Sequence, residues 1–262
     1  MKIACVQMDV LSGKPEQNHA IAEALIRKAA RKQPDVILLP ETWNTGFAPQ
    51  HLDPAQADED GARTKRLCSA LAKELGVNLL AGSVTTRRAD GLYNTAYGFN
   101  RQGELVCSYD KTHLFSPLGE DKAYRKGGSL ARFALDGVHC ALITCYDLRF
   151  PELARRLALP GLDVLFVVSQ WPNQRISHLQ TLARARAIEN QTFVAVCNAC
   201  GDAYGTKFGG RSMVIDPLGN ILRQAGTRQS ILHAEISLDM LAQVRQAIPV
   251  FQDRRPELYS MD

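Results

Sequence analysis

The chain has 262 residues, a formal net charge of +4, and 45% hydrophobic and 22% charged residues. This balance is typical of a folded globular protein and excludes a disordered chain. The positive charge is small and scattered over solvated faces, which argues against a nucleic-acid-binding surface. No apolar run approaches the roughly 20 residues that a membrane-spanning helix needs. We therefore expect neither nucleic acid nor membrane as a partner.

The N-terminal stretch "MKIACVQMDV" enters a short apolar strand directly, without the apolar core and small-residue cleavage site of a signal peptide. We therefore expect a cytoplasmic protein. Its seven cysteines show no disulfide framework and are expected to be reduced. Cys197 and Cys200 form a lone Cys-x-x-Cys at the end of an apolar run, without a second pair or a histidine at zinc spacing. Packing is favoured there over a metal or redox site.

Strand-like and helix-like segments alternate along the chain. In the first third, strands are predicted at 2–8, 35–40 and 77–84, and helices at 16–32 and 62–75, the second closed by Gly76. Two strands at 93–99 and 104–110 follow, joined by the hairpin signal "NRQG".

The second half repeats the alternation. Strands are predicted at 138–144, 162–170, 192–199 and 230–236, a hairpin within 209–226, and helices at 151–159, 176–190 and 237–247. Pro151 suits a first helical turn, where its missing N–H is no loss. The helices can cover both faces of the strands, which indicates a layered α/β sandwich with a mixed sheet arrangement. No linker or low-complexity tract divides the chain, so we expect one domain over residues 1–262.

Three strand ends present side chains that carry chemistry. Glu41 follows "DVILLP", where partial desolvation would raise its pKa and suit it to proton transfer. Lys111 follows "ELVCSYD", and its ammonium could stabilise an oxyanion. Cys145 follows "VHCALIT" at a strand-to-helix turn, where a nearby helix N-terminus would ease ionisation of the thiol. Taken singly, each also fits an ordinary structural role: a cap or ion pair, a surface lysine, a buried cysteine.

A proton carrier, a cation and a nucleophile at neighbouring strand ends form a constellation for acyl transfer. The carboxyl ends of strands are where α/β folds gather their chemistry. The sequence contains no phosphate-binding or dinucleotide-binding glycine loop and no histidine pair at metal spacing. A Cys–His hydrolase is less favoured, because none of the six histidines has a distinctive context.

Three stretches in this order, "LLPETWNTGF", "YDKTHLF" and "ITCYDLRFPEL", resemble the signature regions of the nitrilase superfamily of carbon–nitrogen hydrolases. The similarity extends over nearly the whole chain and includes "QWPNQRISHLQTLARARAIENQTFVAVCNACG". The resemblance implies a four-layer αββα sandwich with mixed sheets, paired into homodimers. It also implies that no metal or organic cofactor is required.

The resemblance assigns roles to individual residues. It maps the family's catalytic triad onto Glu41, Lys111 and Cys145, and its second glutamate onto Glu120 in "LFSPLGEDKAY". The expected reaction passes through a thioester on the cysteine, with the oxyanion held by Lys111 and the backbone N–H of Tyr146. A catalytically idle binding protein of the same fold is the alternative, although all four positions match.

The stretch "CYDLRFPE" is similar to the ω-amidase and deaminated-glutathione amidase branches, whereas true nitrilases more typically carry Cys-Trp-Glu. The resemblance favours a small-molecule 2-oxo acid monoamide such as 2-oxoglutaramate as the substrate, with deaminated glutathione or an N-carbamoyl amino acid as alternatives. Its carboxylate calls for a planar cation, and Arg149 or Arg175 could supply one, although Arg149 could equally pair with Glu152. Aromatic side chains that could wall the pocket are Trp43, Phe47 and Trp171.

Overall fold

The computed structural model describes residues 1–259. Two large mixed sheets form its centre, and a separate two-stranded ribbon lies at one end. The first sheet has the order β15-β1-β2-β4-β5-β6, with β3 paired to β4, and the second has the order β14-β13-β10-β9-β8-β7. In each sheet a parallel centre is flanked by antiparallel strands.

The strands of the first sheet are β1 (Lys2–Gln7), β2 (Val36–Leu38), β3 (Asp58–Glu59), β4 (Asn78–Arg88), β5 (Gly91–Phe99), β6 (Leu105–Asp110) and β15 (Ser230–Glu235). Those of the second sheet are β7 (Arg132–Leu135), β8 (Val138–Thr144), β9 (Val164–Ser169), β10 (Phe193–Asn198), β13 (Met213–Ile215) and β14 (Ile221–Gln224). The ribbon consists of β11 (Cys200–Ala203) and β12 (Thr206–Gly209). The helices are α1 (Pro15–Ala30), α2 (Ala62–Leu75), α3 (Glu120–Ala123), α4 (Pro151–Ala158), α5 (Ile176–Asn190) and α6 (Asp239–Ala247).

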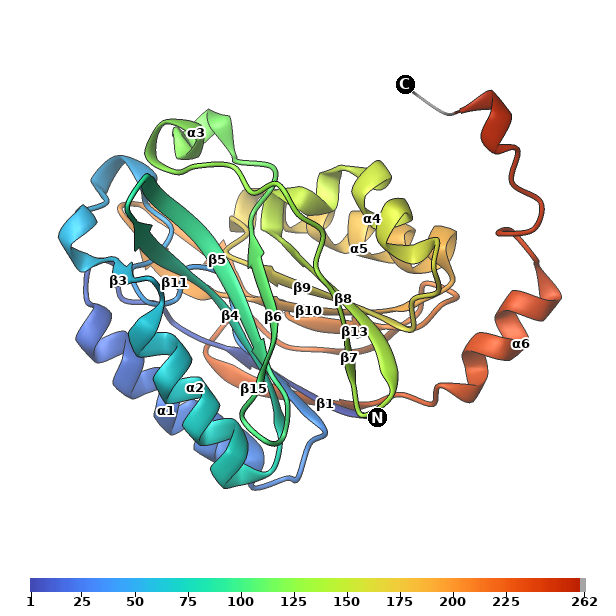
Figure 1. The fold of residues 1–262 in the computed structure, drawn as a ribbon, viewed down its shortest axis with the longest axis horizontal. Helices are drawn as coiled ribbons and strands as arrows, with labels where there is room; N and C mark the ends of the chain where they lie inside the picture. The colour runs from blue at the N-terminus through green and yellow to red at the C-terminus, as the bar shows by residue number, and fades with distance from the viewer. Residues whose placement is uncertain (260–262) are drawn as a thin grey trace.

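Three apolar clusters hold these elements together as four layers. Alternate residues of both sheets, such as Leu38 and Phe166, meet in a central cluster. The opposite faces pack against helices, α1 and α2 on the first sheet and α4 and α5 on the second. Figure 1 shows the two helix pairs on opposite sides of the strands. The predicted αββα sandwich is confirmed. The central strands of each sheet, such as β1 and β9, are apolar runs that are buried on both faces.

Local sequence signals explain several boundaries. Gly76 ends α2 in the left-handed conformation at φ +64°, which a residue without a Cβ adopts at little cost. Pro151 begins α4, as its fixed φ predicts. Both predicted hairpins are present, β5–β6 and β13–β14.

The sequence patterns did not predict β3, β7, the β11–β12 ribbon or the short α3. The prediction of a single domain over 1–262 includes residues 260–262, which lie outside the described residues. Among the helices of residues 1–259, none is both long and apolar enough to cross a membrane. Cys197 and Cys200 are buried free thiols on β10 and β11.

Candidate active site

Cys145 stands at a sharp turn between β8 and the short 3₁₀ helix that precedes α4. Its φ of +47° is uncommon for a residue with a Cβ, and such strain collects at functional sites. The turn is held by a capping box in which Asp147 accepts the backbone N–H of Thr144 at 2.9 Å. Cys145 is 8% exposed, and its sulfur faces a pocket.

Lys111 follows the last residue of β6, and its side chain is fully buried. Its Nζ donates to Glu41 Oε1 at 2.8 Å and to both carboxylate oxygens of Glu120 at 3.0 and 2.8 Å. Burial alone would lower the pKa of Lys111, but the Glu120 and Glu41 carboxylates raise it well above its ordinary value. Lys111 therefore stays protonated and links the two carboxylates.

Glu41 lies beyond β2 and is also fully buried. Besides the lysine, its Oε1 accepts Asn94 Nδ2 at 2.9 Å, and its Oε2 accepts the backbone N–H of Gln170 at 2.8 Å. Gln170 Nε2 returns a hydrogen bond to the Glu41 carbonyl at 2.6 Å. The carboxylate is thus fixed by residues of both sheets, because Gln170 directly follows β9.

Glu120 begins α3, a helix of one turn that the sequence patterns did not predict. Its Oε2 accepts the backbone N–H of Phe115 at 2.6 Å, which folds the loop back over the lysine. Burial raises the pKa of Glu120, the Lys111 ammonium lowers it, and the Glu41 carboxylate raises it again, with a net upward shift.

The thiol of Cys145 is electrostatically coupled to these groups. Its burial and the neighbouring Glu41 carboxylate raise its pKa well above 9.0, against a smaller opposing effect of Lys111. The net shift of the thiol pKa is thus upward, opposite to the easier ionisation expected from a nearby helix N-terminus, because burial and the Glu41 carboxylate favour the neutral thiol. The thiol is protonated in the free protein, so it needs a base at the moment of attack, and Glu41 is beside it.

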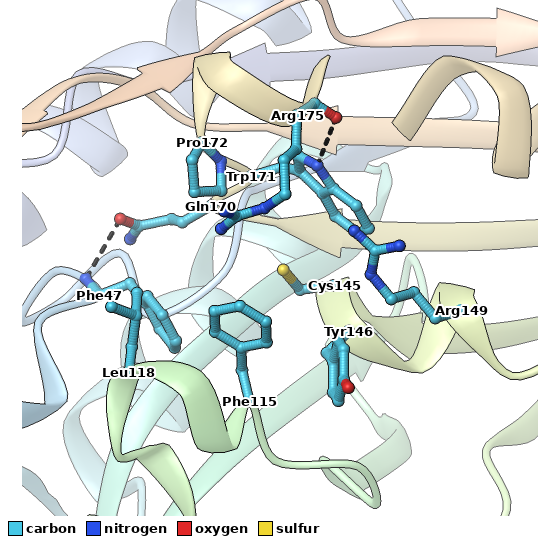
Figure 2. Close-up of a pocket in the computed structure, with 10 residues that line it drawn as sticks. All are labelled: Phe47, Phe115, Leu118, Cys145, Tyr146, Arg149, Gln170, Trp171, Pro172 and Arg175. Atoms are coloured by element: carbon cyan, nitrogen blue, oxygen red, sulfur yellow. Dashed lines mark hydrogen bonds between the residues drawn. The ribbon is translucent and has the colours of Figure 1, made fainter. Parts of the chain in front are cut away.

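The pocket in front of Cys145 has apolar walls and two cationic side chains. Figure 2 shows the sulfur surrounded by side chains from four separate segments. The lining residues are Phe47, Phe115, Leu118, Cys145, Tyr146, Arg149, Gln170, Trp171, Pro172 and Arg175. The free volume is about 20 Å³, room for one or two water molecules, so a larger ligand requires side chains to move.

Arg149 and Arg175 both lie on this pocket, and neither has a carboxylate partner in the part of the chain that the structure describes. The Arg149 guanidinium lies 4.9 Å from the ring of Trp171, and the Arg175 guanidinium lies 5.4 Å from the ring of Phe115. No ion pair among residues 1–259 includes either arginine, so the alternative pairing of Arg149 with Glu152 is absent from this part of the chain. Arg149 Nη2 lies 3.3 Å from His178 Nδ1, and both guanidinium groups retain N–H donors for a ligand carboxylate.

Of the three aromatic residues predicted to wall the pocket, two line it and one does not. Phe47 and Trp171 line the pocket, and the Phe47 ring also lies 5.2 Å from Lys111 Nζ. The prediction for Trp43 is wrong: its ring is fully buried in the cluster beneath the first sheet, and its Nε1 donates to the Ala81 carbonyl at 2.6 Å. A turn at Thr42 with φ +36° separates it from Glu41. Tyr146 follows the cysteine and lines the pocket.

Sequence reasoning missed three buried residues that organise the site. Asn94 on β5 donates to both glutamates, and Gln170 links Glu41 to the loop at Phe47. Asp147 connects the turn at Cys145 to the segment after Lys111. Gln170 directly follows an apolar strand, Asn94 lies within one and Asp147 lies three residues beyond one, and polar side chains at such positions are too common to single out these residues.

Comparisons with known proteins agree with this geometry. The family model described as carbon-nitrogen hydrolase matches residues 2–246. A 2-oxoglutaramate amidase of Bacillus subtilis is 42% identical over 257 residues and covers 98% of both chains. The human omega-amidase NIT2 is 32% identical, over 100% of this chain and 97% of its own.

A solved structure shows the same fold. It is the CN-hydrolase superfamily protein XC1258 of Xanthomonas campestris, which carries an arsenic adduct in its active site. The TM-score is 0.92 at 31% identity, over 100% of this chain and 99% of that one. From its family match, its relatives and its fold, the chain belongs to the carbon–nitrogen hydrolase family.

Proposed function

We propose that the protein hydrolyses a small carboxylated amide, of which 2-oxoglutaramate is the best example, to the acid and ammonia through a thioester on Cys145. One observation carries the proposal: buried Lys111 holds the Glu41 and Glu120 carboxylates together beside a pocket that contains the Cys145 thiol. This arrangement provides a base, a cation and a nucleophile in a site largely closed to water.

In the first half of the reaction, Glu41 takes the proton of the Cys145 thiol as the sulfur attacks the amide carbonyl carbon. The oxygen of the tetrahedral intermediate becomes negative and is stabilised by the Lys111 ammonium and the backbone N–H of Tyr146. Protonated Glu41 then gives its proton to the leaving nitrogen. The C–N bond breaks, ammonia departs, and the acyl group stays on sulfur as a thioester.

In the second half, water enters the position that ammonia has left. Glu41 accepts a proton from the water as its oxygen attacks the thioester carbonyl, and the same two donors stabilise the new oxyanion. The C–S bond breaks, the sulfur recovers the proton from Glu41, and the acid leaves. Glu120 keeps Lys111 in place and does not exchange protons with the substrate.

The substrate class is supported by the pocket and by the relatives. Arg149 and Arg175 offer planar guanidinium groups that suit a carboxylate at the far end of a short acyl chain. Neither group is tied to a protein carboxylate among residues 1–259, so both can move as the substrate enters. The Bacillus subtilis relative is named for its action on 2-oxoglutaramate.

The test is ammonia release from 2-oxoglutaramate by wild type and by Cys145→Ala. Removal of the nucleophile should lower kcat by about 10⁴-fold or more, because the thioester route is closed. The matched control is Cys68→Ala, a fully buried cysteine of α2 that does not line the pocket, and this variant should keep its kcat.

Normal ammonia release by Cys145→Ala would refute the thioester mechanism. If the wild type is active but prefers deaminated glutathione or an N-carbamoyl amino acid in the same assay, the proposed mechanism stands and the proposed substrate is wrong. The single domain, the cytoplasmic location and the homodimer stay predictions; light scattering after size-exclusion chromatography measures the last of them.

A further inference from the structure

Asn94 is a fully buried polar residue in the middle of the first sheet. It lies on β5 between β4 and β6, opposite Thr85 in the β4–β5 ladder. Its backbone carbonyl accepts the N–H of Lys111 at 2.9 Å. The residue is thus attached to the catalytic segment through its main chain as well as its side chain.

The two N–H groups of the Asn94 amide each have a different acceptor. Nδ2 donates to Glu41 Oε1 at 2.9 Å and to Glu120 Oε1 at 3.1 Å. The amide oxygen is buried and has no partner within residues 1–259. A flipped amide would place this oxygen against two carboxylates, so the orientation is fixed by the chemistry of its neighbours.

We propose that Asn94 is a positioning residue that holds the Glu41 and Glu120 carboxylates at a fixed separation and favours the ionised state of both. This inference rests on the proposed role of Glu41 as the base for Cys145. In this role Asn94 acts on catalysis through the two glutamates and does not contact the substrate.

Four kinds of group face the glutamate pair. Lys111 is its cation, the Cys145 thiol lies on the pocket side, and Tyr124 faces it from the segment after α3. The neutral donors are the Asn94 amide and the backbone N–H groups of Gln170 and Phe115. Hydrogen bonds to the charged form of a carboxylate favour that form. Without the amide, each carboxylate loses one hydrogen-bond donor and the like-charge repulsion between the glutamates is less well compensated, so the pair should retain a proton to a higher pH.

The experiment measures kcat/KM against pH for wild type and Asn94→Leu, a variant of similar volume without N–H donors. In Asn94→Leu the acidic limb of the kcat/KM profile should move to higher pH by about one unit, because protonated Glu41 cannot accept the thiol proton. Asn94→Ser, whose hydroxyl can donate only one hydrogen bond, should give a smaller shift in the same direction and serves if the leucine variant does not fold.

Asn78→Leu is the matched control. Asn78 is equally buried on β4, also donates to a carboxylate, that of Asp136, and also has an unpaired amide oxygen, but it lies at the other end of the sheet. It should lower the melting temperature and leave the acidic limb in place. An unchanged acidic limb in both Asn94 variants, or an equal shift in Asn78→Leu, would overturn the inference.

A second readout does not depend on any amide substrate. The rate at which iodoacetamide labels Cys145 should show the same upward shift of its acidic limb in the Asn94 variants, since labelling also requires the thiol to lose its proton. If wild type hydrolyses no amide but this shift is present, the proposed function fails and the role of Asn94 stands. If wild type is active and neither readout shifts, the role of Asn94 fails alone.

Discussion

A fully buried lysine such as Lys111 requires opposite charge within hydrogen-bonding distance, because an isolated ammonium in the protein interior loses several kcal/mol of hydration. Glu41 and Glu120 meet this requirement with three contacts of 2.8–3.0 Å. The pair of carboxylates exceeds the charge of one lysine, and the protonated Cys145 thiol adds none. The ionised Glu41 can therefore accept the thiol proton as the sulfur forms its bond to the carbonyl carbon.

Arg149→Met and Arg175→Met test which guanidinium binds the substrate carboxylate. A charge-assisted hydrogen bond is worth about 1.5–3 kcal/mol, so the responsible variant should raise KM for 2-oxoglutaramate by about 10- to 100-fold. Turnover of pentanamide, which lacks a carboxylate, should be nearly unchanged. Arg66→Met, at an exposed site on α2, is the control. Equal losses on the charged and neutral amides would argue against carboxylate binding by either arginine.

The elements that carry the site are the ends of strands from both sheets. β2 and β6 of the first sheet lead to Glu41 and Lys111, and β8 of the second leads to Cys145. Asp147 connects the site segments that follow the strands of the two sheets. Its fully buried carboxylate accepts Tyr109 Oη at 2.7 Å and the backbone N–H of His113 at 3.0 Å, on either side of the lysine. The turn that carries Cys145 and the segment that carries Lys111 are thus both held by the Asp147 carboxylate.

Asp147→Asn should separate these elements, because the amide replaces an acceptor oxygen with a donor group that faces other donors. We expect a loss of about 3 kcal/mol in the free energy of unfolding and a fall of at least about tenfold in kcat. Denaturant unfolding and ammonia release measure the two effects. Asp216→Asn is the matched control, since this buried carboxylate accepts backbone N–H groups in the β13–β14 hairpin. Wild-type kcat in the folded Asp147 variant would contradict the proposed connection.

At the scale of the whole molecule, the four layers place the pocket where the two sheets meet. Glu41 accepts the backbone N–H of Gln170, which belongs to the other sheet's loop, so the site is complete only when the central apolar cluster holds the sheets together. Figure 1 shows the segment from β6 through α3 passing over this end of the strands. The geometry of the site thus depends on how the two sheets pack against each other.

Particular residues show how far the sequence could predict this arrangement. Glu41, Lys111 and Cys145 were predicted together because each ends an apolar strand, a local pattern that strand topology converts into proximity. The prediction for Trp43 was wrong because the turn over residues 41–45 directs its side chain beneath the sheet, and no local pattern indicates that turn. Asn94 was missed because its importance arises from two glutamates that are distant in sequence.

Longer-range structure was missed for the same reason. The ribbon β11–β12 and the short α3 have weak periodic patterns of their own and are defined by what they pack against. The raised pKa of Cys145 likewise depends on burial by distant segments, whereas the sequence indicated only the adjacent helix. Apolar strands and helices, by contrast, carry their period in the sequence and were predicted closely.

The central claim is that the acyl group of the substrate passes through the sulfur of Cys145. Wild-type protein mixed briefly with 2-oxoglutaramate and quenched with acid should carry, on the peptide containing Cys145, the added mass of the acid minus water. Cys145→Ala should carry none. Rapid ammonia release without an adduct at Cys145, or with the adduct on another of the cysteines, would contradict the account.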